Sequence, residues 1–131
     1  MILVDTHVVV WLALDATQLS PKARAAIRQA RKSEDGLAVS DITLLELTRL
    51  VSKERIRLDI SLESFLQEVE SRFTVLPITA RACLMALKLP PAYPNDPADR
   101  IIGGTALAED LPLITADRAI RQAKAALKTV W

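Results

Sequence analysis

The sequence contains one cysteine, one histidine, three glycines and few aromatic residues. Because Cys83 has no second cysteine to pair with, we expect no internal disulfide and a reducing, cytoplasmic environment. No apolar run approaches the length of a membrane span, and the apolar opening at residues 1–4 is too short for a signal peptide. Trp11 and Trp131 stand apart from other aromatic residues, which favours core or interface packing over stacking on nucleic-acid bases.

Half of the 131 residues are hydrophobic and a quarter are charged, the balance of a soluble globular domain that buries its own core. We therefore expect one domain over residues 1–131. The net charge of +1 indicates neither nucleic acid nor membrane as a partner. Lys and Arg nevertheless gather away from the acidic motifs, in the segments 24–32 and 53–57. Solvated helix faces explain such runs, and a basic rim around an acidic pocket would suit a polyanionic substrate.

Short apolar runs alternate along the chain with longer stretches of helical periodicity. Wholly apolar strands separated by helices are typical of a parallel sheet that is covered on both faces. The sequence therefore predicts an α/β fold, a three-layer α/β/α sandwich of Rossmann-like type with a central parallel sheet. We expect strands at 2–4, 37–39, 74–76 and 112–115, a final edge strand at 129–131, and helices at 8–14, 22–33, 41–51, 62–69, 80–89, 97–110 and 118–127.

Four acidic residues occupy positions where such a fold brings side chains together. Asp5 and Asp117 each follow a strand, and the carboxyl ends of parallel strands meet at one edge of the sheet, where ligands bind. Asp99 lies in the first turn of a helix that runs antiparallel to the fourth strand, so it reaches the same edge. Glu46 lies about one turn into the helix that follows the second strand.

Each acid also has a simpler explanation. A lone Asp at a strand-to-helix turn most often caps the helix, and Asp96 before Pro97 has the features of such a cap, with Asp99 at the third helical position. Glu46 shares a helix face with Arg49 and Lys53, which allows a surface ion pair. Carboxylates crowded at one edge, however, raise one another's pKa unless a cation neutralises them, and Mg²⁺ or Mn²⁺ suits a cluster of oxygens.

The segments 2–8, 40–47, 96–102 and 113–117 resemble, in order and spacing, the signature of the PIN-domain family, and most of all the VapC-like toxins of bacterial toxin–antitoxin pairs. The resemblance implies a Mg²⁺- or Mn²⁺-dependent endoribonuclease in which a metal-activated water cleaves RNA. It maps the catalytic quartet onto Asp5, Glu46, Asp99 and Asp117, with Asp5 and Asp99 as direct metal ligands and Asp117 as a further ligand. It also implies a homodimer and a VapB-like antitoxin whose tail occupies the acidic groove.

Other residues near these motifs have two interpretations each. Thr6, Ser40 and Thr115 could bind a metal-bound water or a phosphate oxygen, or they could cap helices. Arg100 could hold an RNA phosphate, orient a neighbouring carboxylate or form a solvent-exposed ion pair. We expect His7 to pack or to donate a hydrogen bond. The pair Gly103-Gly104 departs from the family pattern, and it indicates either close helix packing or local looseness.

Three alternative functions remain open from the sequence. A metal-dependent phosphatase or phosphotransferase usually has a second Asp two residues after its nucleophile, whereas His7 occupies that position after Asp5. A phospho-accepting regulatory module needs an Asp after the third strand, and residues 76–78 contain none. A non-catalytic interaction module on a nuclease fold is disfavoured because all four acids are present.

Overall fold

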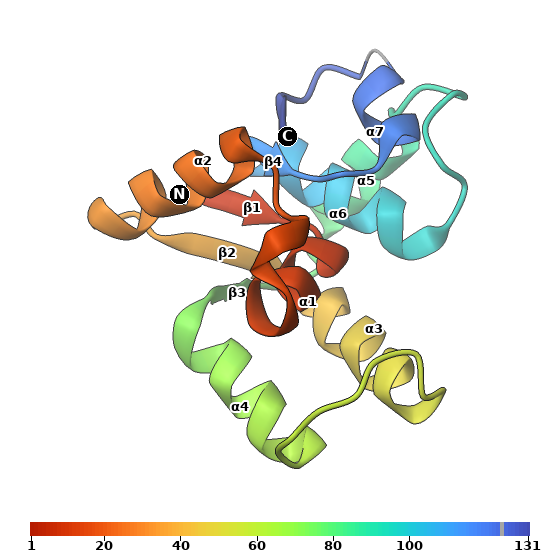
Figure 1. Ribbon diagram of the computed structural model, residues 1–131. Helices are drawn as coiled ribbons and strands as arrows, with labels where there is room; N and C mark the ends of the chain where they lie inside the picture. The colour runs from red at the N-terminus through yellow and green to blue at the C-terminus, as the bar shows by residue number, and fades with distance from the viewer. Residues whose placement is uncertain (124) are drawn as a thin grey trace.

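In the computed structural model, which describes residues 1–123 and 125–131, short parallel strands form one central sheet (Figure 1). The strand order is β3-β2-β1-β4-β5, and Leu3 of β1 pairs with Ala38 of β2 on one side and with Leu113 of β4 on the other. This arrangement confirms the predicted parallel sheet and the edge strand at the C-terminal end. The strands are β1 (Ile2–Val4), β2 (Leu37–Ser40), β3 (Thr74–Leu76), β4 (Leu113–Ile114) and β5 (Thr129–Val130).

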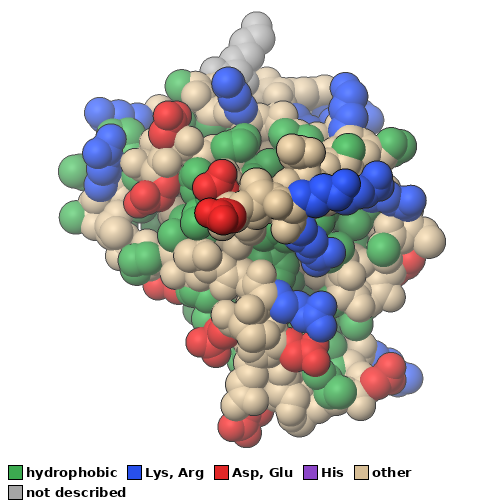
Figure 2. Space-filling view, turned by 90° about the vertical axis from the view of Figure 1, so that its left-hand side faces the viewer, with side chains coloured by type: hydrophobic (Ala, Val, Ile, Leu, Met, Phe, Trp, Pro, Cys, Tyr) green, Lys and Arg blue, Asp and Glu red, His purple; other side chains and the backbone are tan. Residues whose placement is uncertain are grey.

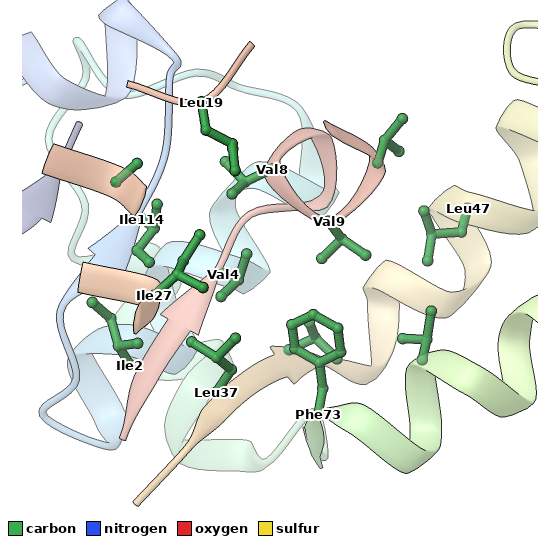
Figure 3. Packing of buried hydrophobic residues seen from close by; sticks show 14 of the residues in the cluster. Ile2, Val4, Val8, Val9, Leu19, Ile27, Leu37, Leu47, Phe73 and Ile114 are labelled. Carbon is green, nitrogen blue, oxygen red and sulfur yellow. The ribbon is translucent and has the colours of Figure 1, made fainter. Parts of the chain in front are cut away.

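Successive side chains of the central strands point to opposite faces of the sheet, and each face carries its own core. Val4 and Ile114 belong to one core and Leu3 to the other. Figure 3 shows Val8 and Ile27 packing with Val4 in the first core. The first core is covered by α1 (Thr6–Leu14), α2 (Pro21–Lys32) and α4 (Leu62–Arg72). The other face is covered by α6 (Pro97–Ala108) and α7 (Arg118–Gln122). The helix α5 (Ala80–Leu87) packs on α6, and α3 (Asp41–Ser52) continues from β2.

Several helices begin at the residues that the sequence indicates. Ser20 caps α2 by accepting a hydrogen bond from the N–H of Ala23, and Pro21 occupies the first turn. Asp96 caps α6 in the same way, with Pro97 as the first helical residue. These caps place the first turn of α6, and therefore Asp99, at a fixed position beside the sheet.

Several helix boundaries differ from prediction by one to five residues, including the ends of α4 at Arg72 and of α6 at Ala108. α1 begins at Thr6 rather than at residue 8, because Asp5 serves as its cap, and it is followed by a 3₁₀ turn at Ala16–Gln18 that the sequence did not indicate. α5 ends at Leu87 rather than at residue 89. α7 ends at Gln122 rather than at residue 127, and Lys124 of the predicted helix lies outside the described residues. The chain after α7 returns to pair β5 with β4, which limits the length of the helix.

The two adjacent glycines of α6 lie where neighbouring atoms approach closely. A Cβ on Gly104 would collide with the backbone carbonyl of Ala82 and the backbone nitrogen of Ala86, both in α5. Of the two interpretations of Gly103-Gly104, close packing is therefore the correct one. No helix in the described part of the chain is long and apolar enough to cross a membrane.

Candidate active site

The carboxyl ends of β1 and β4 meet at the point where the chain changes direction across the sheet. From β1 the chain proceeds to β2 and β3 on one side, and it later returns to β4 and β5 on the other. Such a switch point leaves room between the segments that follow the two strands, and open α/β sheets bind ligands there. Asp5 directly follows β1, and Thr115 directly follows β4.

The carboxylate of Asp5 is buried and held at both oxygens. Its Oδ1 accepts a hydrogen bond of 2.8 Å from the backbone N–H of Thr6, and its Oδ2 accepts one of 2.7 Å from the hydroxyl of Thr115. Burial raises the pKa of Asp5 above its ordinary value, although these two hydrogen bonds oppose the rise. Asp5 is thus both the cap of α1 and a rigidly placed carboxylate at the switch point.

Glu46 of α3 reaches the same region through a chain of hydroxyl groups. The hydroxyl of Thr6 donates a hydrogen bond of 2.5 Å to Oε1 of Glu46, and it lies 3.0 Å from the hydroxyl of Thr43. Because the single hydroxyl proton of Thr6 is directed at Glu46, Thr43 is the donor to Thr6. Burial, followed by the charges of Asp5 and Asp96, raises the pKa of Glu46.

The ion pair considered for Glu46 is absent. In the region described, neither Arg49 nor Lys53 forms a salt bridge with Glu46, whose carboxylate turns toward Thr6 instead. Sequence reasoning also missed Thr43, a fully buried residue one helical turn before Glu46. A polar residue at that spacing, on the buried side of the helix, was the available signal.

Asp99 is a half-buried carboxylate in the first turn of α6. Its backbone N–H donates to Asp96, but among the described residues no hydrogen bond reaches its carboxylate. Burial, and then the charges of Asp5, Asp96, Glu46 and Asp117, raise the pKa of Asp99 to about 7. Asp96 is a helix cap, as the sequence indicates, yet its charge still acts on both Glu46 and Asp99.

Asp117 combines the two roles that the sequence left open. Its Oδ1 accepts hydrogen bonds from the backbone N–H groups of Ala119 and Ile120, at 2.8 and 3.2 Å, and so caps α7. Its own backbone N–H donates to the hydroxyl of Thr115 at 3.1 Å. Since the charge of Asp117 also raises the pKa of Asp5 and Asp99, it belongs to the same acidic cluster.

The supporting residues Ser40, Thr6 and Thr115 have structural roles. Ser40 caps α3 by accepting a hydrogen bond from the N–H of Ile42, whereas Thr6 and Thr115 hold the carboxylates of Glu46 and Asp5. The exposed ring of His7 lies 6.3 Å from that of Trp11. The ring centroids of Trp11 and Trp131 lie 5.6 Å apart with the rings tilted by 47°, and both side chains pack on the core, as expected.

Within the part of the chain that the structure describes, Arg100 makes neither the ion pair nor the carboxylate contact considered for it, whereas binding of an RNA phosphate stays a prediction. Its guanidinium donates to the backbone carbonyls of Ala86, Leu89, Pro90 and Tyr93 and forms no ion pair with an acid in the described residues. It therefore binds the end of α5 to the loop before α6. A planar group with five donors suits this task better than a flexible ammonium would.

Tyr93 is a residue of this region that sequence reasoning overlooked. Its side chain is buried, and its hydroxyl donates a hydrogen bond of 3.1 Å to the backbone carbonyl of Asp99. A Cβ on Gly103 would collide with this hydroxyl, so the glycine makes room for the tyrosine. The signal in the sequence was the only tyrosine of the chain, placed in a proline-rich segment directly before Asp96.

A cavity of about 420 Å³ opens beside the acidic cluster, lined at one end by Thr6, Glu46 and Asp96. No three Asp, Glu, His or Cys side chains of the described residues are arranged to hold a metal ion as they stand. Mg²⁺ keeps several of its waters and needs only one or two direct carboxylates, so the donor set is compatible with it. Burial first, and then the charges of neighbouring acids, raise the pKa values of Asp5, Glu46 and Asp99, and a divalent cation would favour their ionised forms.

Comparison with known proteins agrees with this geometry. The family model of the PIN domain matches residues 2–126. The chain belongs to the PIN-domain family. It is 38% identical over 120 residues to Ribonuclease VapC22 of Mycobacterium tuberculosis (strain ATCC 25618 / H37Rv), covering 92% of this chain and 89% of the relative.

Solved structures of VapBC toxin–antitoxin proteins have a similar fold. VapBC2 from Rickettsia felis, bound to a DNA fragment from its promoter, superposes with a TM-score of 0.74 at 20% identity over the whole of both chains. VapBC-1 from nontypeable Haemophilus influenzae gives a TM-score of 0.66 at 23% identity, covering 98% of this chain and 96% of that one.

Proposed function

We propose that the protein is a Mg²⁺- or Mn²⁺-dependent endoribonuclease, the toxin of a toxin–antitoxin pair, built as one domain that acts in the cytoplasm. The observation that carries the proposal is the crowding of Asp5, Glu46, Asp99 and Asp117, which together with burial raises the pKa of Asp99 to about 7. The relative that is 38% identical is named a ribonuclease, which supports RNA as the substrate over a small phosphate ester.

In this proposal the carboxylates have unequal roles. Asp5 and Asp99 bind the metal directly, because Asp5 is held rigidly and the carboxylate of Asp99 has no competing hydrogen bond in the described residues. Asp117 supports the ion with Oδ2, since Oδ1 is engaged by α7. When bound, the divalent cation polarises the attacking water and stabilises the charge that builds on the phosphate.

The remaining groups of the chain orient the site. Thr115 holds Asp5 in one rotamer, so the carboxylate loses little conformational freedom on binding a cation. The hydroxyl of Thr6 occupies Oε1 of Glu46, which leaves Oε2 as the oxygen able to accept a proton from the water. Thr43 fixes Thr6 in turn, so two threonines determine the direction of Glu46.

The partners follow from the same family relationship. Structures similar to this one are VapBC complexes, and we propose that a VapB-like antitoxin binds this chain with a segment in the acidic groove. We also propose a homodimer. Leu84 and Leu87 of α5 and Ile78 before it are 59%, 82% and 41% exposed, an apolar surface typical of an interface between subunits.

Purified protein, freed of antitoxin, should cleave RNA when Mg²⁺ or Mn²⁺ is added, and EDTA should stop the reaction. Asp5→Asn should remove most of the activity without unfolding the protein. Turnover of a generic phosphate ester in the absence of RNA cleavage would instead favour a phosphatase.

A further inference from the structure

The cavity beside the acidic cluster has two ends of opposite charge. Glu46 and Asp96 line one end, and three basic side chains line the other: Arg49 of α3, Lys53 at its C-terminus and Arg55 just beyond. From Glu46 to Lys53 the helix advances about 10 Å, the length of a few nucleotides of extended single strand. A polyanion with one phosphate at the carboxylates would thus have further phosphates within reach of the basic end.

The three basic side chains are not used by the fold. They are exposed, and in the described part of the chain none of them forms a salt bridge, although Glu46 lies on the same helix face as Arg49 and Lys53. Glu46 is turned inward by the hydroxyl of Thr6, so it does not neutralise them. Their charges therefore remain available to a ligand in the cavity.

The backbone after α3 places Arg55 at this cavity at some conformational cost. Glu54 has φ of 56°, a left-handed conformation that helices usually assign to glycine at this position. The N–H of Arg55 donates a hydrogen bond of 2.9 Å to the carbonyl of Leu50, which reverses the chain and returns Arg55 to the helix. A basic residue in the last helical turn, such as Arg49, also complements the helix dipole, but that effect does not require Arg55 to line the same cavity.

We propose that Arg49, Lys53 and Arg55 bind the backbone phosphates of single-stranded RNA on one side of the cleaved bond, with the strand lying along α3. This inference rests on the proposed function, because it takes the acidic end of the cavity as the place of cleavage. Contacts to phosphates position a strand without reading its bases. The surface should therefore strengthen binding equally for RNAs of different sequence.

Binding is best measured in the Asp99→Asn background with Mg²⁺, using fluorescence anisotropy of short unstructured RNAs of two unrelated sequences. The test variant carries Arg49→Ala, Lys53→Ala and Arg55→Ala. The control variant carries Arg28→Ala, Arg31→Ala and Lys32→Ala on α2, which also holds basic residues in its last turn. These three line a separate cavity on α2. Figure 2 shows that Lys and Arg side chains are exposed on the face that lies to the left in Figure 1.

The test variant should raise the Kd for both RNAs about tenfold or more, and the slope of log Kd against log salt should fall by about 2, since each phosphate contact on single strands contributes about 0.7. The control variant should leave both quantities within twofold of the parent. Unchanged Kd and slope in a folded test variant would overturn the inference. The inference would also be overturned if the test variant lost affinity for a polyglutamate peptide but not for RNA, because the surface would then bind an acidic segment of a partner protein.

A parallel cleavage assay on the chain with Asp99 intact separates this inference from the proposed function. RNA binding that depends on the three residues, without cleavage under any metal, leaves the inference standing and removes the nuclease. RNA cleavage together with unaltered RNA affinity in the test variant would support the nuclease and overturn the inference about the three basic residues. If the triple variant does not fold, the single variants Lys53→Gln and Arg55→Gln, both at exposed positions, should each lower the salt slope by about 0.7.

Discussion

The hydroxyl of Thr115 donates a hydrogen bond of 2.7 Å to Oδ2 of Asp5, although 110 positions separate the two residues in the chain. Both residues are buried: Thr115 is fully buried, and Asp5 is 5% exposed. The bond joins the residues that directly follow β1 and β4, so the alignment of two strands determines the position of one carboxylate. The site is therefore a product of the sheet register as much as of its acidic residues.

Thr115→Val should lower the free energy of unfolding of the metal-free protein by about 1–3 kcal/mol, because it leaves a buried carboxylate oxygen without its donor. Thr115→Ser retains the hydroxyl and should lose much less. Urea denaturation at pH 7 measures both values. Equal stabilities for the two variants would show that the hydrogen bond contributes nothing.

Asp99→Asn should stabilise the metal-free protein at alkaline pH. The folded-state pKa of Asp99 is about 7, above the value of the unfolded chain, so folding favours the protonated acid. The favourable contribution is complete below pH 4 and is lost as the pH rises toward and through 7. Between pH 5 and pH 8, the melting temperature of the parent protein should thus fall more than that of Asp99→Asn.

The same pair of proteins tests metal binding without an activity assay. Saturating Mg²⁺ should raise the melting temperature of the parent at pH 8, because the cation binds the folded carboxylates. The rise should be much smaller in Asp99→Asn. An identical rise in both proteins would exclude Asp99 as a ligand.

Gly104→Ala should destabilise the protein by about 1–3 kcal/mol, even though alanine is about 1 kcal/mol better than glycine in a helix interior. The added methyl would meet the backbone of α5 at Ala82 and Ala86, which cannot move aside as the tip of a side chain can. Thermal denaturation gives the sign directly. A stabilised variant would mean that α5 and α6 do not approach as closely as described.

Leu84→Glu and Leu87→Glu together should convert the proposed dimer to a monomer, because charges placed in an apolar interface lose their hydration without gaining partners. The matched control is Leu14→Glu on α1, which is 45% exposed and lies outside this surface. Light scattering after size-exclusion chromatography reports the mass of each. A monomeric parent protein would disprove the dimer, and a dimeric double variant would move its interface elsewhere.

Sequence patterns were sufficient for most of the fold. Apolar runs as short as 37–39 were recognisable as strands because buried parallel strands need no polar alternation, and Ser20-Pro21 and Asp96-Pro97 are strong local signals of helix starts. The end of α7 was not predictable from local signals. It depends on the pairing of β5 with β4, which is a long-range requirement.

The acidic residues of the candidate site could be named from the sequence, but the groups that hold them could not. Thr43 and Tyr93 act through one hydrogen bond each, to Thr6 and to the carbonyl of Asp99, and no spacing rule predicts either contact. The hydrogen bonds of Arg100 could not be predicted, because its position beside Asp99 in the sequence does not determine the direction of its side chain. Its guanidinium donates to carbonyls of the loop before α6, such as those of Leu89 and Tyr93, rather than to the carboxylates.

The most direct test is cleavage of a labelled single-stranded RNA by the purified, antitoxin-free protein, with Mg²⁺ or Mn²⁺ and with EDTA. Asp5→Asn and Asp99→Asn should each reduce the rate at least about 100-fold, the size of effect expected when transition-state charge stabilisation is lost. Asp59→Asn, at an exposed position away from the cluster, should cleave at the parental rate. Metal-independent cleavage, or equal rates for Asp99→Asn and Asp59→Asn, would contradict the assignment of the acidic cluster as the metal site of a ribonuclease.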